Sequence, residues 1–227
     1  MTLFLALLLV AAFSGTGVSP VLSLAAASEP SLVNTADFQR AGKEIRLPGL
    51  VIHDTSPPYV EAASSISITN GILEFIAVEP EGRDYESLLT LTAKPSALQF
   101  ALLLIGCETG TVRQTKSNIV IEIEHNGKRV PVEQWLIDRK TKQPPANLCW
   151  VFNGSYFAIN PLTEKPTFRA DAEQAHIALW WQPSIVVNLA DDRGNPYKGD
   201  DQGFDVNPTV VPPVGTPVKL IIRPATK

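Results

Sequence analysis

Cysteine is almost absent from this chain of 227 residues, which contains only Cys107 and Cys149. Two cysteines without a C-x-x-C motif cannot hold an iron–sulfur cluster, so that class of redox protein is excluded. Two interpretations of the pair remain open. In an exported protein the two would form one disulfide bond, and otherwise they would be buried thiols that pack like small apolar side chains.

Histidine is equally rare, and the only imidazoles belong to His53, His125 and His176. No two of them have the spacing of metal ligands on one helix, and no zinc-binding motif is present. A zinc site could only be assembled from distant parts of the chain. We therefore expect no cofactor.

Concentrated positive charge is also missing. The net charge is −4, and the Lys and Arg residues do not gather into a stripe. Because a nucleic acid requires clustered positive charge against its phosphates, we expect no nucleic-acid partner. The partners that remain are an unknown protein or a small-molecule ligand.

The first residues, Met1 to Ala27, carry no charged side chain. Leu3 to Phe13 is an apolar run of eleven residues, well short of the ~20 residues that span a bilayer. Small residues at Ala25 and Ala27 suit a cleavage site. We predict that residues 1–27 are a signal peptide, that the protein is secreted or periplasmic, and that the mature chain has no membrane span. The alternative is an uncleaved N-terminal segment that anchors the protein.

The mature chain is long enough to form one domain with its own core. Residues 28–43 are polar and weakly patterned, so we expect a flexible leader there, followed by a single domain over residues 44–227. Two Asn-Gly dipeptides, Asn70-Gly71 and Asn126-Gly127, lie between alternating segments and predict β-hairpins. Nineteen prolines and many short alternating segments indicate a β-rich fold.

One helix is predicted from Pro95 to Ile105, between a proline suited to a first turn and Gly106, which suits a helix end. Its side chains are apolar almost all round, and such a helix must be buried on more than one side. The fold class that we predict is α+β and β-rich, with a mainly antiparallel sheet packed around this one short buried helix.

A cluster of aspartates offers the best candidate for a metal site. Calcium takes about six to eight oxygen ligands, many of them from carboxylates. The candidate ligands are Asp191, Asp192, Asp200, Asp201 and Asp205. Their spacing differs from the regular ladder of a calcium loop, and the alternative is a solvated turn.

Two carboxylates are the best candidates for catalysis. Glu74 lies in one predicted strand, and Glu86 and Ser87 open the next, so the two carboxylates could face each other across a hairpin. General acid–base chemistry needs such a pair. The alternative is that both lie on a solvated face. Ser87 is not part of a G-x-S-x-G elbow, so a nucleophilic serine has no further support.

Four blocks of sequence carry a family resemblance. They are LEFIAVEPEGRDYESLLTLTAKPSALQFALLLIGCETGT from residue 73, VEQWLIDRKTKQP from residue 132, WVFNGSYF from residue 150 and VPPVGTPVKLIIRP from residue 211. In order and spacing, residues 44–224 resemble the YdjY-like domain family. The resemblance implies an exported bacterial protein and brings no particular reaction with it. Members often have a His-Glu-Ser step where this chain has Tyr85-Glu86-Ser87, and a helix histidine where it has Gln99, so any role of those histidines is in doubt here.

These observations lead to one main functional expectation and two alternatives. The main one is a non-enzymatic exported module that binds a partner or supports the cell envelope. The first alternative is a hydrolase with Glu86 as general acid or base, which requires Glu74 and Glu86 to converge with at least one raised pKa. The second is a calcium-stabilised module. The dense aromatic run from Cys149 to Phe157 could line a groove or close a core.

Overall fold

The computed structural model describes residues 31–34, 37–112, 116–190 and 192–225. The predicted signal peptide and Asp191 therefore lie outside the described residues. Among the described helices, none has the length and apolar character needed to cross a membrane.

Most strands of the described chain belong to one large mixed sheet. Its members are β1 (Gln39–Ala41), β2 (Glu44–Leu47), β3 (Leu50–His53), β4 (Tyr59–Ile66), β6 (Phe75–Val78), β7 (Ser87–Leu91), β8 (Ile119–His125), β9 (Lys128–Pro131), β11 (Trp150–Phe152), β14 (Ala175–Ala178), β15 (Val187–Leu189) and β17 (Pro217–Pro224). Two smaller sheets accompany it: β5 (Ile72–Leu73) with β16 (Phe204–Val206) and β10 (Leu136–Asp138), and the hairpin of β12 (Phe157–Ile159) and β13 (Pro166–Phe168).

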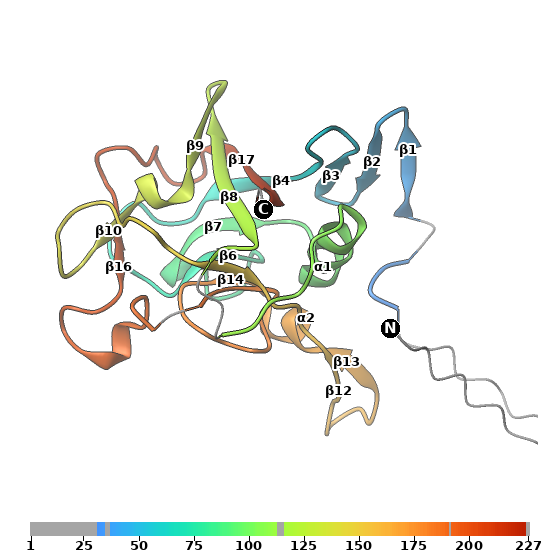
Figure 1. Ribbon diagram of the computed structural model, residues 1–227. Coiled ribbons are helices and arrows are strands. Elements are labelled where there is room, and N and C mark those ends of the chain that lie inside the picture. The colour runs from blue at the N-terminus through green and yellow to red at the C-terminus, as the bar shows by residue number, and fades with distance from the viewer. Residues whose placement is uncertain (1–30, 35–36, 113–115, 191, 226–227) are drawn as a thin grey trace, which may run out of the picture.

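Helices are few and short in the described chain. The α-helices are α1 (Pro95–Leu104) and α2 (Arg169–Glu173), and the 3-10 turns used below are η2 (Asp84–Glu86), η3 (Val132–Trp135) and η4 (Pro196–Lys198). Figure 1 shows α1 beside the large sheet, β1 to β3 at one side of the molecule, and the β12–β13 hairpin projecting from it. The β-rich class is confirmed, with two α-helices where the sequence predicted one.

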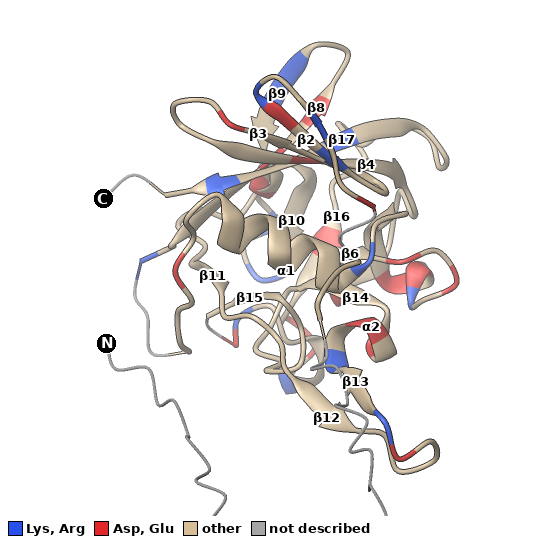
Figure 2. Cartoon of the chain, turned by 90° about the vertical axis from the view of Figure 1, so that its right-hand side faces the viewer, with Lys and Arg blue, Asp and Glu red and all other residues tan. Residues whose placement is uncertain are grey.

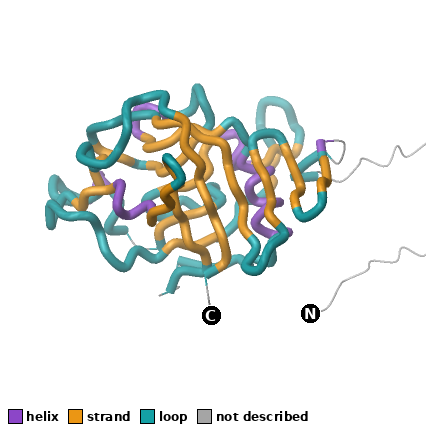
Figure 3. The backbone as a smooth tube through the Cα atoms, turned by 90° about the horizontal axis from the view of Figure 1, so that it is seen from above, coloured by secondary structure: helices purple, strands orange, loops and turns teal. Residues whose placement is uncertain are grey.

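Strand β4 joins the parts of the large sheet. One of its edges pairs with β17, while its other edge pairs first with β3 and then with β7. Most pairings are antiparallel, but β6 runs parallel to β7 and β14 runs parallel to β15. Figure 3 shows the long central strands lying side by side, with helix α1 at one end of them.

Strand β11 lies at one end of the large sheet and approaches β8, and side chains supply much of the hydrogen bonding between these two segments. The backbone N–H of Trp150 donates to Ser117 Oγ at 2.9 Å, and that of Phe152 donates to Asn118 Oδ1 at 2.9 Å. Asn118 in turn donates its own backbone N–H to the Trp150 carbonyl at 3.2 Å. Because Trp150 and Phe152 are buried, these bonds satisfy donors that would otherwise lack a partner.

Alternation explains which side of each strand faces the core. In β8, Ile119, Ile121 and Ile123 are buried, while the residues between them are partly exposed. This period of two is what a sheet with one solvated face requires. Strand β6 is buried along its whole length, because β7 and β14 flank it inside the sheet.

Helix α1 is less enclosed than its sequence predicts. It begins at Pro95, as expected, and buries Leu98, Ala101 and Leu102. Leu103 and Leu104 at its end are 46% and 49% exposed. The prediction of burial on more than one side therefore holds for the first two turns only.

One predicted hairpin is confirmed and the other is wrong. Asn126-Gly127 forms the turn between β8 and β9. The segments around Asn70-Gly71 do not pair with each other, because β5 joins β16 in a separate sheet and β6 joins β7 and β14. In the segment predicted as a flexible leader, Gln39–Ala41 pairs with β2 and the Phe38 ring packs edge-on against Phe100 at 5.1 Å.

Candidate functional site

The parallel pairing of β6 and β7 places Glu74 beside Glu86. Phe75 lies opposite Ser87 in the register, so the residues before them are neighbours too. The Glu74 backbone N–H donates to the Glu86 carbonyl at 2.9 Å. The predicted convergence of the two glutamates is therefore observed, although a parallel pair of strands produces it and not a hairpin.

Arg83, in the turn before η2, lies between the two carboxylates. Its Nη1 is 3.5 Å from Glu74 Oε2, and its Nε is 3.8 Å from Glu86 Oε1. The guanidinium carbon also lies 4.1 Å from the centre of the Phe75 ring. Because two carboxylates and an aromatic ring contact the guanidinium, together they restrict its position.

Tyr197 covers the other side of Glu74. Its hydroxyl donates a short hydrogen bond to Glu74 Oε1, although the residue itself is 75% exposed. The turn η4 holds it there, because Asn195 Oδ1 accepts the backbone N–H of Tyr197 at 2.9 Å. Gly194 permits the close approach of this loop, since a Cβ at that position would lie 1.7 Å from the Leu179 carbonyl oxygen.

In the cluster formed by Glu74, Arg83, Glu86 and Tyr197, named here the Glu74–Arg83–Glu86–Tyr197 cluster, the surroundings shift the pKa of two groups. Burial, followed by repulsion from Glu74, raises the pKa of Glu86, while the nearby Arg83 opposes the shift. The hydrogen bond to Glu74 raises the pKa of Tyr197 to about 12, because the bond uses its proton. The cluster thus contains the buried carboxyl of Glu74, a neighbouring acid whose pKa is raised, and a tyrosine whose pKa is raised.

Ser87, the third predicted catalytic residue, is not accessible. It is fully buried, and its hydroxyl donates to the Leu89 carbonyl at 2.9 Å. This hydrogen bond within its own strand uses the only proton of the hydroxyl. Ser87 therefore supports the strand and has no free path to a ligand.

Asp192, Asp201 and Asp205 of the calcium hypothesis contact other side chains. Asp192 forms a close ion pair with Lys198, and Asp205 lies 3.7 Å from the Arg139 guanidinium. Within the described chain, no group of three or more His, Cys, Asp or Glu residues is placed to hold a metal ion. Calcium binding stays a prediction of the sequence, without support from these contacts.

The three histidines lie far apart in the sheet and make different contacts. His176 is buried in β14, one ring nitrogen is 2.8 Å from the Ala93 carbonyl, and burial lowers its pKa to about 4. His53 stacks on Tyr59 with ring centres 4.2 Å apart and lies between Glu44 and Glu61.

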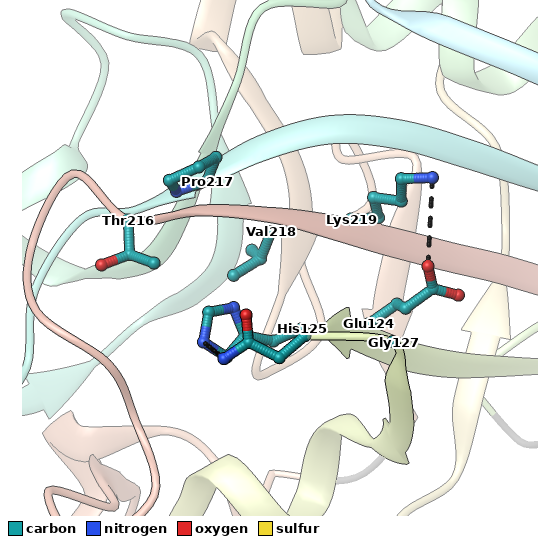
Figure 4. A pocket seen from close by; sticks show the side chains of 8 residues that line it. Glu124, His125, Gly127, Thr216, Pro217, Val218 and Lys219 are labelled. Carbon is teal, nitrogen blue, oxygen red and sulfur yellow. Dashed lines mark hydrogen bonds and ion pairs between the residues drawn. The ribbon is translucent and has the colours of Figure 1, made fainter.

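His125 lines an open hollow at the end of the β8–β9 hairpin, with a volume of about 430 Å³. Figure 4 shows its ring beside Thr216 and Val218, with Lys219 reaching over Glu124. The Lys219 ammonium is 3.9 Å from Glu124 and 3.0 Å from Glu61, so it is already paired. Figure 2 shows that acidic and basic residues are also interspersed along the rest of the fold.

The remaining sequence candidates serve the core. Gln99 accepts the backbone N–H of Ser155 at 2.6 Å, and Trp150 is buried with its indole N–H on Glu133 at 2.7 Å. Neither contacts Glu86 by any described interaction. The structure does not show the disulfide expected between the two cysteines, and burial raises the pKa of the Cys107 thiol to about 11.

Sequence reasoning missed Arg83 and Tyr197. Arg83 is only three residues before Glu86, a spacing that favours a contact within a turn, so it carried a usable signal. Tyr197 is 123 residues from Glu74, and no local pattern could have connected them.

One comparison with known proteins gives a result. The family model of the YdjY domain matches residues 59–223, which include every member of the cluster. Neither the curated proteins nor the solved structures include a significant match to the chain.

Two substitutions in the cluster will shift the pKa of Glu86 in opposite directions. Arg83→Gln removes the cation that lowers the pKa of Glu86, so that pKa will rise further. Glu74→Gln removes a repelling anion, so the pKa of Glu86 will fall. A pH titration of the Glu86 side-chain carboxyl by ¹³C NMR measures both. Arg46→Gln, which affects an ion pair with Glu44 elsewhere, is the control and will leave the value unchanged. Shifts of the reverse sign would show that the cluster does not form as described.

Proposed function

This chain belongs to the YdjY domain family, and from that premise we propose that it is an exported, non-enzymatic binding module of the cell envelope. Its ligand site is the Glu74–Arg83–Glu86–Tyr197 cluster. The ligand is small or polymeric and carries hydroxyl or amino groups that donate hydrogen bonds to a carboxylate.

The observation that carries this proposal is the unused acceptor capacity of Glu86. Among the described residues its carboxylate contacts only Arg83, at 3.8 Å, and accepts no hydrogen bond. Two aromatic side chains of the same region are open to solvent, Tyr85 at 70% and Tyr197 at 75% exposure. Exposed aromatic rings beside a charged acceptor suit ligands that have both a polar group and an apolar face.

The contacts of the other groups support binding without catalysis. Glu74 is occupied by Arg83 and Tyr197, and Ser87 is buried in its strand. His176 is buried, and His53 and His125 make contacts elsewhere. A nucleophile with an adjacent base is therefore not supported within the described residues.

The raised pKa of Glu86 favours one second candidate, a carboxylate-dependent hydrolase. A carboxyl whose pKa is raised is a better proton donor to a leaving group, while water attacks the bond being broken. In that role Glu86 would be the general acid and Glu74 the anion that keeps it protonated. The binding experiment described below separates this role from binding alone.

Export is proposed from the sequence of residues 1–27, which lack charge and end in small residues. The expected result is a secreted or periplasmic protein whose first residue is Ser28, measured by N-terminal sequencing of the protein purified from its own cells. A mature chain that still begins near Met1 in the membrane fraction would instead identify an uncleaved anchor.

Soluble muropeptides released from peptidoglycan are a suitable first probe, because they carry both hydroxyl and amino groups. We expect the wild type to bind them in isothermal titration calorimetry and Glu86→Gln to bind at least about ten-fold more weakly. Glu108→Gln removes the same charge from an exposed position outside the cluster and is the matched control. Equal affinities of the wild type and Glu86→Gln, or no binding by either, would contradict the proposed ligand site. Release of shorter products by the wild type but not by Glu86→Gln would favour the hydrolase.

A further inference from the structure

A second concave surface lies where β8 approaches β11, away from the Glu86 cluster. It is a groove with a volume of about 370 Å³. Its apolar walls are formed by Ile119, Val120, Pro131, Pro145, Leu148 and Trp150. The volume falls within the roughly 300–1,000 Å³ of small-molecule sites, which are mostly apolar with a few placed polar groups.

The path of the chain explains why this space stays open. Ser117 and Asn118 tie the start of β8 to β11 through side chains, at one end of the groove. At the other end, β9 stops at Pro131 and the chain turns into η3. Between these two ends a gap separates β8 from β11. The segment that leads to Leu148 forms the far wall of this gap.

Among the described residues that line this groove, Glu133 is the one with a charge. Its Oε1 accepts the indole N–H of Trp150 at 2.7 Å, which fixes the carboxylate against the apolar wall. For Oε2, the described part of the chain provides neither a hydrogen bond nor an ion pair. Glu133 is half-buried, and a carboxylate oxygen forms stronger hydrogen bonds with a charged donor than with a neutral one.

We propose that this groove, here named the Glu133–Trp150 groove, binds a small organic cation with an apolar body. The ammonium group donates to Glu133 Oε2, and the body of the ligand packs against Val120 and Pro131, two apolar lining residues that are partly or fully open to solvent. Charge complementarity excludes an organic anion, which would meet the Glu133 carboxylate. A neutral apolar ligand would cover Oε2 without giving it a partner, at a cost in desolvation. The proposal rests on the groove alone and is independent of the Glu86 site.

Three probes of one shape separate these possibilities: 2-phenylethylammonium, 2-phenylethanol and 3-phenylpropionate. We expect the ammonium to bind at least ten-fold more tightly than the alcohol and the carboxylate to show no binding. Titrations followed by ¹H–¹⁵N NMR measure the affinities, and the indole N–H of Trp150 reports on the groove itself. Equal affinity for ammonium and alcohol, no binding of the ammonium, or shifts confined to residues outside the groove would overturn the proposal.

Two variants test the roles of the charge and the space separately. Glu133→Gln keeps an oxygen that can accept the Trp150 N–H but removes the charge, so the ten-fold preference for ammonium will disappear while the alcohol binds as before. Val120→Trp fills the groove from a partly exposed position and will abolish binding of all three probes. Glu108→Gln is the control for loss of one negative charge and will change neither result. An unchanged preference in Glu133→Gln would assign the binding to another site.

Discussion

The buried carboxylate of Glu74 is the constraint on which the candidate site depends. The residue is 3% exposed, and three other segments of the chain meet at it. Its backbone N–H bonds to Glu86, its carbonyl accepts the N–H of Leu179, and its side chain contacts Arg83 and Tyr197. Burying a carboxyl group is costly unless it is paired or hydrogen-bonded. Glu74 therefore requires the turn before β7 and the loop of η4 to be in place.

This arrangement separates two roles for chemically similar groups. Glu74 uses its side-chain oxygens for contacts within the protein, whereas the Glu86 carboxylate accepts no hydrogen bond from the described residues. Burial, together with the repulsion between the two, raises the pKa of Glu86. A structural acid thus tunes a functional one, and this relation connects the fold of the β6–β7 pair to the function we propose.

The sequence predicted the β-rich class, the strand β7, the helix α1 and the family, because these depend on local periodicity, on turn residues and on recurring blocks. It also identified Glu74 and Glu86 as a pair, but for the wrong geometric reason. An acidic turn between two strands usually joins a hairpin, whereas here the chain crosses back so that β6 and β7 run parallel. Pairing direction depends on which strands neighbour them in the sheet, and periodicity of a single segment does not contain that information.

Other errors share this origin in long-range contacts. Asn70-Gly71 has the residues of a tight turn, yet the strands on its two sides join different sheets. The role of Tyr197 depends on a loop 123 residues beyond Glu74. The Glu133–Trp150 contact likewise joins two segments that no motif connects.

The most direct test of the account is a double-mutant cycle between Glu74 and Tyr197, measured by urea unfolding of the wild type, Glu74→Gln, Tyr197→Phe and the double variant. If Glu74 organises the site through Tyr197, the two substitutions will be non-additive, with a coupling free energy of about 0.5 kcal/mol or more. Additive effects within experimental error would show that Tyr197 lies over Glu74 without stabilising it, and the cluster would then not be the organised site described here.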